Sequence, residues 1–231
     1  MNLPMEVLLV AGVYALYLQD SALLLHYDEV VLTHGRRWTA SVGGPLEFRG
    51  RRLHLPDPWT PTRAIFRASW LGEPTGGRRT QRPHFLAALR AVHPGCRALW
   101  ALMLVGLPLL LWAFPHPLAL LALAVSIYAV TLGLAIQVWR YRRAFELSGR
   151  DALSMGFELL CCPPHAINVV RRLSLRRGLG EDAMHVVRRS LDDDDAREAC
   201  RQIRERLSYA FDFHGERPDL VAARQRLEEQ A

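Results

Sequence analysis

The sequence predicts a mainly α-helical membrane protein, with three transmembrane helices, a small cytoplasmic β-meander lobe and a helical cytoplasmic tail. Three observations lead to this fold class. Residues 98–139 contain no Asp, Glu, Lys or Arg, residues 7–19 form a second uncharged run, and every arginine lies outside both runs. Because about 20 apolar residues cross a bilayer as a helix, the longer run has room for two spans.

Residues 98–139 are expected to form a transmembrane helical hairpin. Its turn falls at residues 115–117 (Pro-His-Pro), where two prolines interrupt the apolar sequence. The run ends in residues 139–143, which read Trp-Arg-Tyr-Arg-Arg. Aromatic and basic residues together are typical of a span that leaves the bilayer on its cytoplasmic side.

Residues 1–25 are expected to form the first transmembrane helix. Its uncharged centre is bounded by Glu6 and Asp20. No basic residue precedes it and no small-residue cleavage site follows it, which argues against a secretory signal peptide. Asp20 is then expected at the cytoplasmic end of the span, within reach of head-group water.

The distribution of arginine predicts the topology. All 29 basic residues are Arg, with 12 in residues 26–97 and the other 17 in residues 140–231. Arginine-rich loops are retained in the cytoplasm. We therefore expect a multi-pass protein of a bacterial inner membrane, with a periplasmic N-terminus and a cytoplasmic C-terminus. An arginine-only basic composition is typical of a GC-rich bacterial genome.

Residues 26–97 are expected to hold a cytoplasmic β-rich lobe and an interfacial helix. Short β-branched or alternating runs separated by Gly and Pro signals predict a β-meander, with strands at residues 29–33, 38–42, 46–48 and 52–55. The apolar and aromatic residues 64–71 are expected near the lipid head groups. Residues 83–93 predict an amphipathic helix that lies in the membrane interface before the second span.

Residues 140–231 are expected to form the helical cytoplasmic tail. Four consecutive aspartates at residues 192–195 predict the start of its most regular helix, because acidic side chains there favour the helix dipole. An apolar stripe along this helix consists of Ala199, Ile203, Leu207 and Ala210. Such a narrow stripe predicts docking on one surface, which can be the β-meander of the same chain, another copy or a different protein.

The third span carries a face of small residues at offsets of four, three and four: Ala122, Ser126, Ala129 and Gly133. Small side chains on one face of a helix permit close approach of a second helix in lipid. The sequence therefore predicts helix packing on this face, within the chain or with another molecule.

The most unusual local string contains Cys161, Cys162 and His165. Two thiolates and an imidazole can hold a soft metal or a haem iron. Structural zinc sites, however, separate paired cysteines by two to four residues and use four ligands. The favoured interpretation is two small buried side chains that end a helix before two prolines, and no resident cofactor is predicted.

The function favoured by the sequence is that of a non-catalytic accessory or scaffolding protein. Walker, GxSxG, HExxH and dinucleotide-binding motifs are absent from the sequence, so an enzyme is not favoured. The expected partners are the lipid bilayer and either a second protein or a second copy, and not nucleic acid. Two alternatives stay open: a metal- or haem-handling membrane protein using the cysteine pair, and a transporter subunit in which Asp20 faces a cavity.

Overall fold

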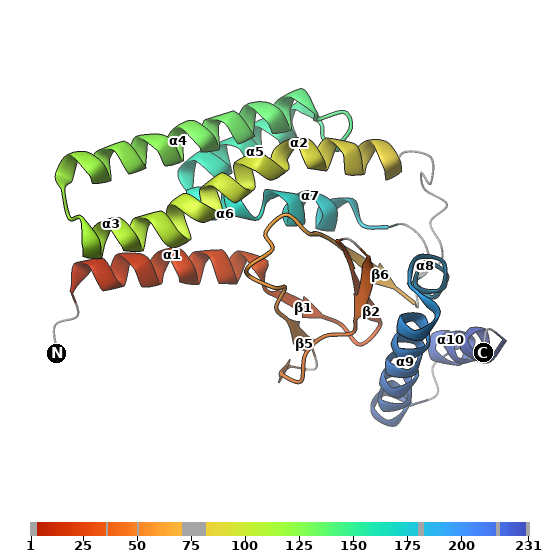
Figure 1. Ribbon diagram of the computed structural model, residues 1–231. Helices are drawn as coiled ribbons and strands as arrows, with labels where there is room; N and C mark the ends of the chain where they lie inside the picture. The colour runs from red at the N-terminus through yellow and green to blue at the C-terminus, as the bar shows by residue number, and fades with distance from the viewer. Residues whose placement is uncertain are drawn as a thin grey trace. The chain divides into compact units, whose positions relative to one another are not determined.

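The computed structural model describes residues 4–35, 37–49, 51–70, 82–179, 183–215 and 218–229. The chain divides into two compact units, each assembled from separate stretches of sequence (Figure 1). The helical unit contains residues 1–21, 57–62 and 80–173, and the mixed unit contains residues 22–56, 63–79 and 174–231. The described chain is mainly helical with small antiparallel sheets, which confirms the predicted secondary-structure class.

The helical unit is built on long apolar helices. In chain order it contains α1 (Met5–Ser21), α2 (Arg82–Trp100), a π-helical segment (Ala101–Gly106), α3 (Leu107–Ala113), α4 (Pro117–Arg140), α5 (Gly149–Cys161), α6 (Pro163–Ile167) and the start of α7 (Val169–Arg177). Helix α4 contacts α2 and α5, and α1 contacts α3 and α6. A helical hairpin is present, since α3 and α4 lie side by side and are joined by a short turn (Figure 1).

The turns before α4 and α5 have a local cause in the sequence. His116 precedes α4 in extended conformation, and its Nδ1 accepts a hydrogen bond from the Leu118 N–H at 3.3 Å. Pro117 then occupies the first turn, where its missing N–H costs nothing. Ser148 begins α5 in the same way, because its Oγ accepts from the Asp151 N–H at 3.1 Å.

The interfacial helix expected at residues 83–93 is not a separate element. It continues through Pro94 and the π-helical segment, so that Pro83–Ala113 forms one helical stretch of 31 residues. The π-helical segment misaligns the main-chain ladder, and the Tyr14 hydroxyl donates a hydrogen bond to the Leu104 carbonyl at 2.7 Å. Long-range packing on α1 therefore supports the irregular part of this stretch.

Helices α2 and α4 approach closely where Gly95 faces Leu134. A Cβ atom built on Gly95 would lie 2.5 Å from Leu134 Cδ2, so this position admits no side chain without movement. The buried side chains of α4 lie on this same side of the helix: Leu123, Ile127, Thr131, Leu134 and Val138.

The mixed unit contains two antiparallel sheets of three strands. Their strands are β1 (Leu23–Leu25), β2 (Glu29–His34), β3 (Trp38–Ser41), β4 (Glu47–Phe48), β5 (Arg51–His54) and β6 (Ala64–Ser69), ordered β1-β5-β4 and β3-β2-β6. The hairpins β2–β3 and β4–β5 follow the expected meander. The single meander was nevertheless wrong, because β1 and β6 complete two sheets.

Two segments assigned to the membrane or its surface are strands of these sheets. Residues 23–25, expected at the end of the first span, pair with β5, with Leu25 opposite Arg52. Residues 64–69, expected near the head groups, pair with the whole of β2. The physical reason is burial of both faces of the strand. Successive side chains of a strand point to opposite faces, and Ile65 and Phe66 are both almost fully buried.

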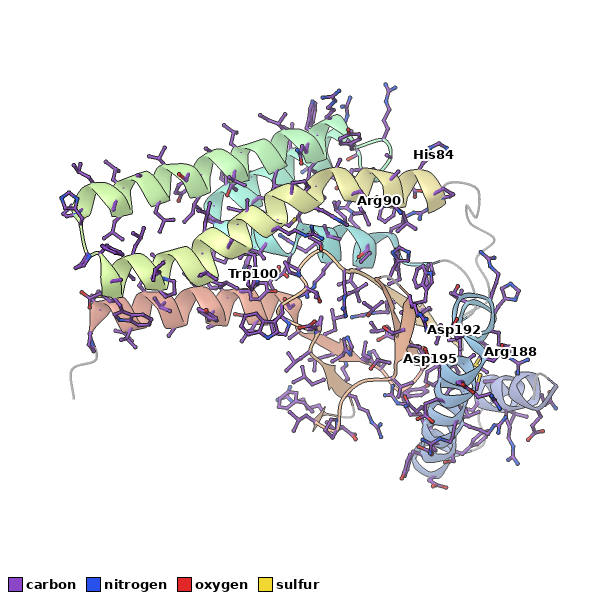
Figure 2. The ribbon with its side chains drawn as sticks, viewed as in Figure 1. His84, Arg90, Trp100, Arg188, Asp192 and Asp195 are labelled. Carbon is purple, nitrogen blue, oxygen red and sulfur yellow. The ribbon has the colours of Figure 1, made fainter. Side chains whose placement is uncertain are left out.

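The expected tail of residues 140–231 belongs to both units. Helices α5 and α6 are part of the helical unit, whereas α8 (Ala183–Ser190), α9 (Asp193–His214) and α10 (Pro218–Glu229) are part of the mixed unit. Asp192 is the N-cap residue of α9, and three further aspartates fill its first turn; Asp192 and Asp195 lie at the start of this helix (Figure 2).

The close approach at Gly95 gives the first prediction. Gly95→Ala should lower the free energy of unfolding by about 1–3 kcal/mol through overpacking against Leu134. Gly133→Ala is the matched control, because a Cβ atom there has no heavy atom within 4 Å. Its higher helix propensity should raise stability by up to about 1 kcal/mol.

A double-mutant cycle tests the cause of this difference. In a Leu134→Ala background, Gly95→Ala should no longer destabilise, because the atoms that it strikes are gone. Thermal and denaturant unfolding followed by circular dichroism measure all four variants. Equal losses from Gly95→Ala with and without Leu134 would contradict the assigned contact.

Candidate functional site

Cys161, Cys162 and His165 lie where α5 passes into α6. Cys161 ends α5 and is exposed, while the other two side chains are half-buried. Cys162 acts through its main chain, since its N–H donates to the Glu158 carbonyl and its own carbonyl accepts from the His165 N–H. Within the described ranges, no group of three or more His, Cys, Asp or Glu side chains is placed to hold a metal ion.

The small-residue face of α4 is exposed. Ala122, Ser126 and Ala129 are open to the surroundings, and no heavy atom would contact a Cβ atom on Gly133. The Ser126 hydroxyl donates back to the Ala122 carbonyl at 2.8 Å. Packing on this face stays a prediction, and its partner would be another molecule.

The apolar stripe of α9 is covered by the chain itself. Ala199, Ile203, Leu207 and Ala210 are all buried within the mixed unit. There α9 contacts α8, α10 and β3. The sequence left three possible docking surfaces open: the same chain, another copy or a different protein. In the structure the same chain covers the stripe, which therefore offers no free docking surface for another protein.

Asp20 lies at the end of α1 beside an arginine. Its Oδ1 is 3.9 Å from Arg172 Nε, and Arg172 Nη2 also contacts Glu158 Oε2 at 2.6 Å. The Asp20 carboxylate therefore lies next to a positive charge that is shared with Glu158. The ion pair gives Asp20 a structural role, whereas the transporter alternative requires Asp20 to face a cavity.

A buried arginine that the sequence did not single out organises the helical unit. Arg171 is 2% exposed. Its Nη1 donates to Ser21 Oγ at 2.8 Å and to Asn168 Oδ1 at 3.2 Å. Its Nη2 donates to the carbonyls of Asp57 and Thr60 at 2.6 and 3.1 Å. One guanidinium thus joins the end of α1, the segment 57–60 and the start of α7.

Aromatic side chains tie the same segment to α1 and α2. The Pro58 carbonyl accepts hydrogen bonds from the Tyr17 hydroxyl at 2.6 Å and from Trp100 Nε1 at 3.1 Å. Asn168 Nδ2 donates to the Tyr17 carbonyl at 3.0 Å and so satisfies the last turn of α1. In the sequence, only the Pro-rich residues 56–61, which predict a rigid extended segment, indicate that this cluster exists.

Electrostatics at Arg171 favour a structural role. Burial lowers the pKa of its guanidinium, while the neighbouring Tyr17 and Asp57 raise it. Arginine stays charged even so, because its ordinary pKa lies far above neutral pH. The Arg171 guanidinium is a buried cation that donates hydrogen bonds largely to neutral oxygens. This arrangement holds segments of main chain together and does not activate a nucleophile.

Removing this guanidinium should weaken the helical unit. Arg171→Met removes the arginine donor from the Thr60 carbonyl, Ser21 Oγ and Asn168 Oδ1, and each unpaired acceptor costs about 1–3 kcal/mol when buried. The Asp57 carbonyl keeps the Thr60 N–H as a donor at 3.3 Å. We expect a fall in unfolding free energy of several kcal/mol and faster proteolysis within residues 57–62. Arg150→Met, an exposed position on α5, is the control and should change stability by less than about 0.5 kcal/mol. Equal stability of the two variants would contradict the assignment.

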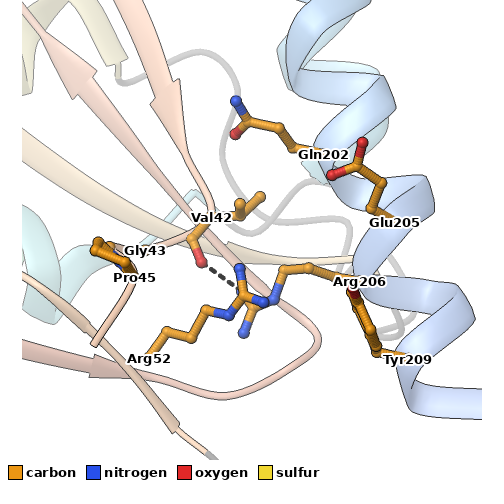
Figure 3. Close-up of a pocket in the computed structure, with 9 residues that line it drawn as sticks. Val42, Gly43, Pro45, Arg52, Gln202, Glu205, Arg206 and Tyr209 are labelled. Atoms are coloured by element: carbon orange, nitrogen blue, oxygen red, sulfur yellow. Dashed lines mark hydrogen bonds between the residues drawn. The ribbon is translucent and has the colours of Figure 1, made fainter. Parts of the chain in front are cut away.

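A pocket of about 190 Å³ lies within the mixed unit. The turn at residues 42–45 and Arg52 form one side, and the α9 residues Gln202, Glu205, Arg206 and Tyr209 form the other (Figure 3). Gly43 has φ +101°, and a Cβ atom there would lie 2.8 Å from the Cβ atom of Arg52. Glycine therefore lets this turn approach β5 directly and close the pocket wall.

Arg206 is the buried charged side chain of this pocket. Its Nη1 donates to the Val42 carbonyl at 2.6 Å and to the Glu29 carbonyl at 3.3 Å, and its Nη2 donates to the His26 carbonyl at 3.2 Å. Burial, and next the charge of Arg52, lowers the pKa of Arg206 to about 10. Like Arg171, it holds separate stretches of main chain together.

The helical unit exposes many large apolar side chains. On α4 alone they include Leu118, Leu121, Val125, Tyr128, Leu132 and Ile136, each at least half exposed. Side chains project outward along α3 and α4 (Figure 2). By length and composition, two helical stretches among the described residues could cross a membrane: Pro83–Ala113 and Pro117–Arg140. Comparisons with protein-family models, curated proteins and solved structures found no match.

Proposed function

We propose that this chain is a non-catalytic accessory or scaffolding protein of a bacterial inner membrane, held by three transmembrane helices and acting through protein contacts. The observation that carries the proposal is the exposed apolar surface of α3 and α4. Trp112 and Phe114 are 63% and 65% exposed, and Leu118 is 69% exposed. Soluble proteins rarely expose apolar patches larger than a few hundred Å², whereas lipid tails solvate such side chains.

The helix lengths are consistent with membrane spans. At 1.5 Å per residue, the 24 residues of α4 reach about 36 Å, which exceeds a hydrocarbon core of about 30 Å. The 31-residue stretch through α2 and α3 is longer still, so its arginine-bearing start would extend beyond the bilayer. Helix α1, with 17 residues, is at the lower limit for a span and ends beside Asp20.

The end of α4 supports the proposed orientation. The Arg142 guanidinium carbon lies 4.5 Å from the ring centre of Trp139, and that of Arg140 lies 5.9 Å from Tyr141. Aromatic rings that carry a cation suit the boundary between lipid and head groups. We place this end in the cytoplasm and the turn at residues 115–117 in the periplasm.

A non-catalytic role is supported by what the buried polar side chains do. Arg171 and Arg206 each bond several main-chain carbonyls, and Asn168 bonds the carbonyl of Tyr17. These groups join segments that are distant in the sequence. Their hydrogen-bonding capacity serves the architecture, which suits a protein that presents surfaces to others.

The topology is tested with reporter fusions. Fusions after residue 75 and at residue 231 should both report the cytoplasm, and a fusion at residue 116 should report the periplasm, because both arginine-rich segments resist translocation. Residues 75 and 231 lie outside the described residues. Opposite compartments for positions 75 and 231 would exclude the three-span proposal.

The exposed small-residue face of α4 is the proposed site of protein contact within the membrane. Ala129→Leu should weaken association at least about tenfold, about 1.4 kcal/mol, because the bulkier side chain prevents close helix approach. Ala124→Leu makes the same chemical change at an exposed position on the opposite side of α4 and should leave association unchanged.

The measurement is the molar mass of the complex in mild detergent, by size-exclusion chromatography with light scattering, together with the proteins that co-purify. Membrane insertion is checked by fractionation in each case. If both leucine variants keep every partner and the molar mass of the parent, the small-residue face is not the contact surface.

A further inference from the structure

The pocket of the mixed unit brings two guanidinium groups together. Arg52 extends from β5 and Arg206 from α9, and their guanidinium groups point toward one another (Figure 3). Their mutual repulsion contributes to the lowered pKa of Arg206. Two cations side by side are favourable only when a negative charge lies between or near them.

The hydrogen bonds of Arg206 leave part of its donor capacity unused. Its three bonds, all to carbonyl oxygens, occupy both protons of Nη1 and one proton of Nη2. The Nε–H and the second Nη2 proton have no acceptor in the part of the chain that the structure describes. Nε and Nη2 form one of the edges through which arginine binds an oxyanion in bidentate fashion.

Arg52 is also without a partner among the described side chains. Its main chain pairs with β1 and β4, but its side chain forms no hydrogen bond or ion pair among the described residues, although Glu47 lies opposite it in the β4–β5 pairing. The acidic residue of the pocket wall, Glu205, is bound to Arg201 at 3.1 Å. Asp28, Glu47 and Glu29 lie near enough to offset part of the repulsion at Arg206. Among the described residues, however, no carboxylate forms a hydrogen bond or ion pair with the side chain of Arg52 or Arg206.

We propose that this pocket binds a phosphate group, either free or as the monoester head of a larger molecule, between Arg52 and Arg206. A phosphate dianion matches two guanidinium groups in charge and supplies acceptors for the unused edge of Arg206. The Tyr209 hydroxyl in the pocket wall is a further donor, and the Gln202 amide has a second N–H besides the one that donates to Glu198 Oε1 at 2.7 Å. The volume of about 190 Å³ has room for a phosphate group.

Phosphate binding in this position would act on the mixed unit as a whole. Arg206 already bonds the Val42 carbonyl, and Arg52 comes from the neighbouring sheet. A phosphate bound to both would add a link between α9, the turn at residues 42–45 and β5. The bound form is then expected to be more stable by linkage.

The test uses the purified full chain. Inorganic phosphate in the millimolar range should raise the midpoint of thermal unfolding at constant ionic strength, with chloride as the reference anion. Arg52→Gln should weaken phosphate binding at least tenfold in calorimetric titration. It should leave the fold intact, because the Arg52 side chain makes no hydrogen bond within the described residues. Arg51→Gln removes the same charge from the adjacent, exposed position, whose side chain points to the other face of β5, and should bind like the parent.

Two further arms distinguish the sources of the phosphate. Glycerol 3-phosphate represents a soluble monoester, and short-chain phosphatidic acid represents a lipid head group, with phosphatidylcholine as its control. Saturable binding of any of the three phosphates that depends on Arg52 supports the proposal, and the tightest one identifies the source. Binding of none of them, or equal loss in Arg52→Gln and Arg51→Gln, overturns it. The outcome is independent of the membrane topology, which the reporter fusions test separately.

Discussion

The helical unit depends on the hydrogen bonds of one buried guanidinium. Helix α1 ends at Ser21, and the segment 57–60 returns to the same unit after a long excursion through the mixed unit. Main-chain carbonyls at such junctions lie outside regular structure and are costly to bury without donors. Arg171 supplies four hydrogen bonds there, and Tyr17 and Trp100 supply the two that Pro58 accepts. Lysine could not replace it, because three donors on one nitrogen do not reach these separate acceptors.

The mixed unit solves the same problem with the same residue type. Arg206 bonds the carbonyls of His26, Glu29 and Val42, which lie more than 160 residues earlier in the chain. In each unit, therefore, a guanidinium joins stretches that the sequence separates widely. The difference lies in their surroundings: both terminal nitrogens of Arg171 donate to oxygens of the helical unit and its Nε is buried, whereas Arg206 has a second arginine and a pocket beside it. This difference is why one cluster is structural and the other is a candidate binding site.

The sequence predicted those features that depend on local periodicity and composition. Uncharged length predicted α1 and the hairpin of α3 and α4, and the four aspartates predicted the start of α9. What it missed depends on long-range pairing. Residues 64–69 read as an apolar segment until β2 provides a partner along its whole length. In the sequence, Arg171 and Arg206 cannot be told from the other arginines of the tail. Which arginines are buried depends on hydrogen-bond acceptors in residues 21–60, far away in the chain.

The exposed faces of α4 connect the membrane proposal with the proposal of protein contacts. Its leucine and isoleucine side chains can be solvated by lipid, so they need no protein partner. Ala122, Ala129 and Gly133 are different, because small side chains fill little space against lipid but let two helices approach closely. The chain uses Gly95 in this way inside the helical unit, where α2 meets Leu134 of α4. The small-residue face of α4 has the same property and is not covered by the chain. Such a face is expected of a membrane helix that assembles with another helix.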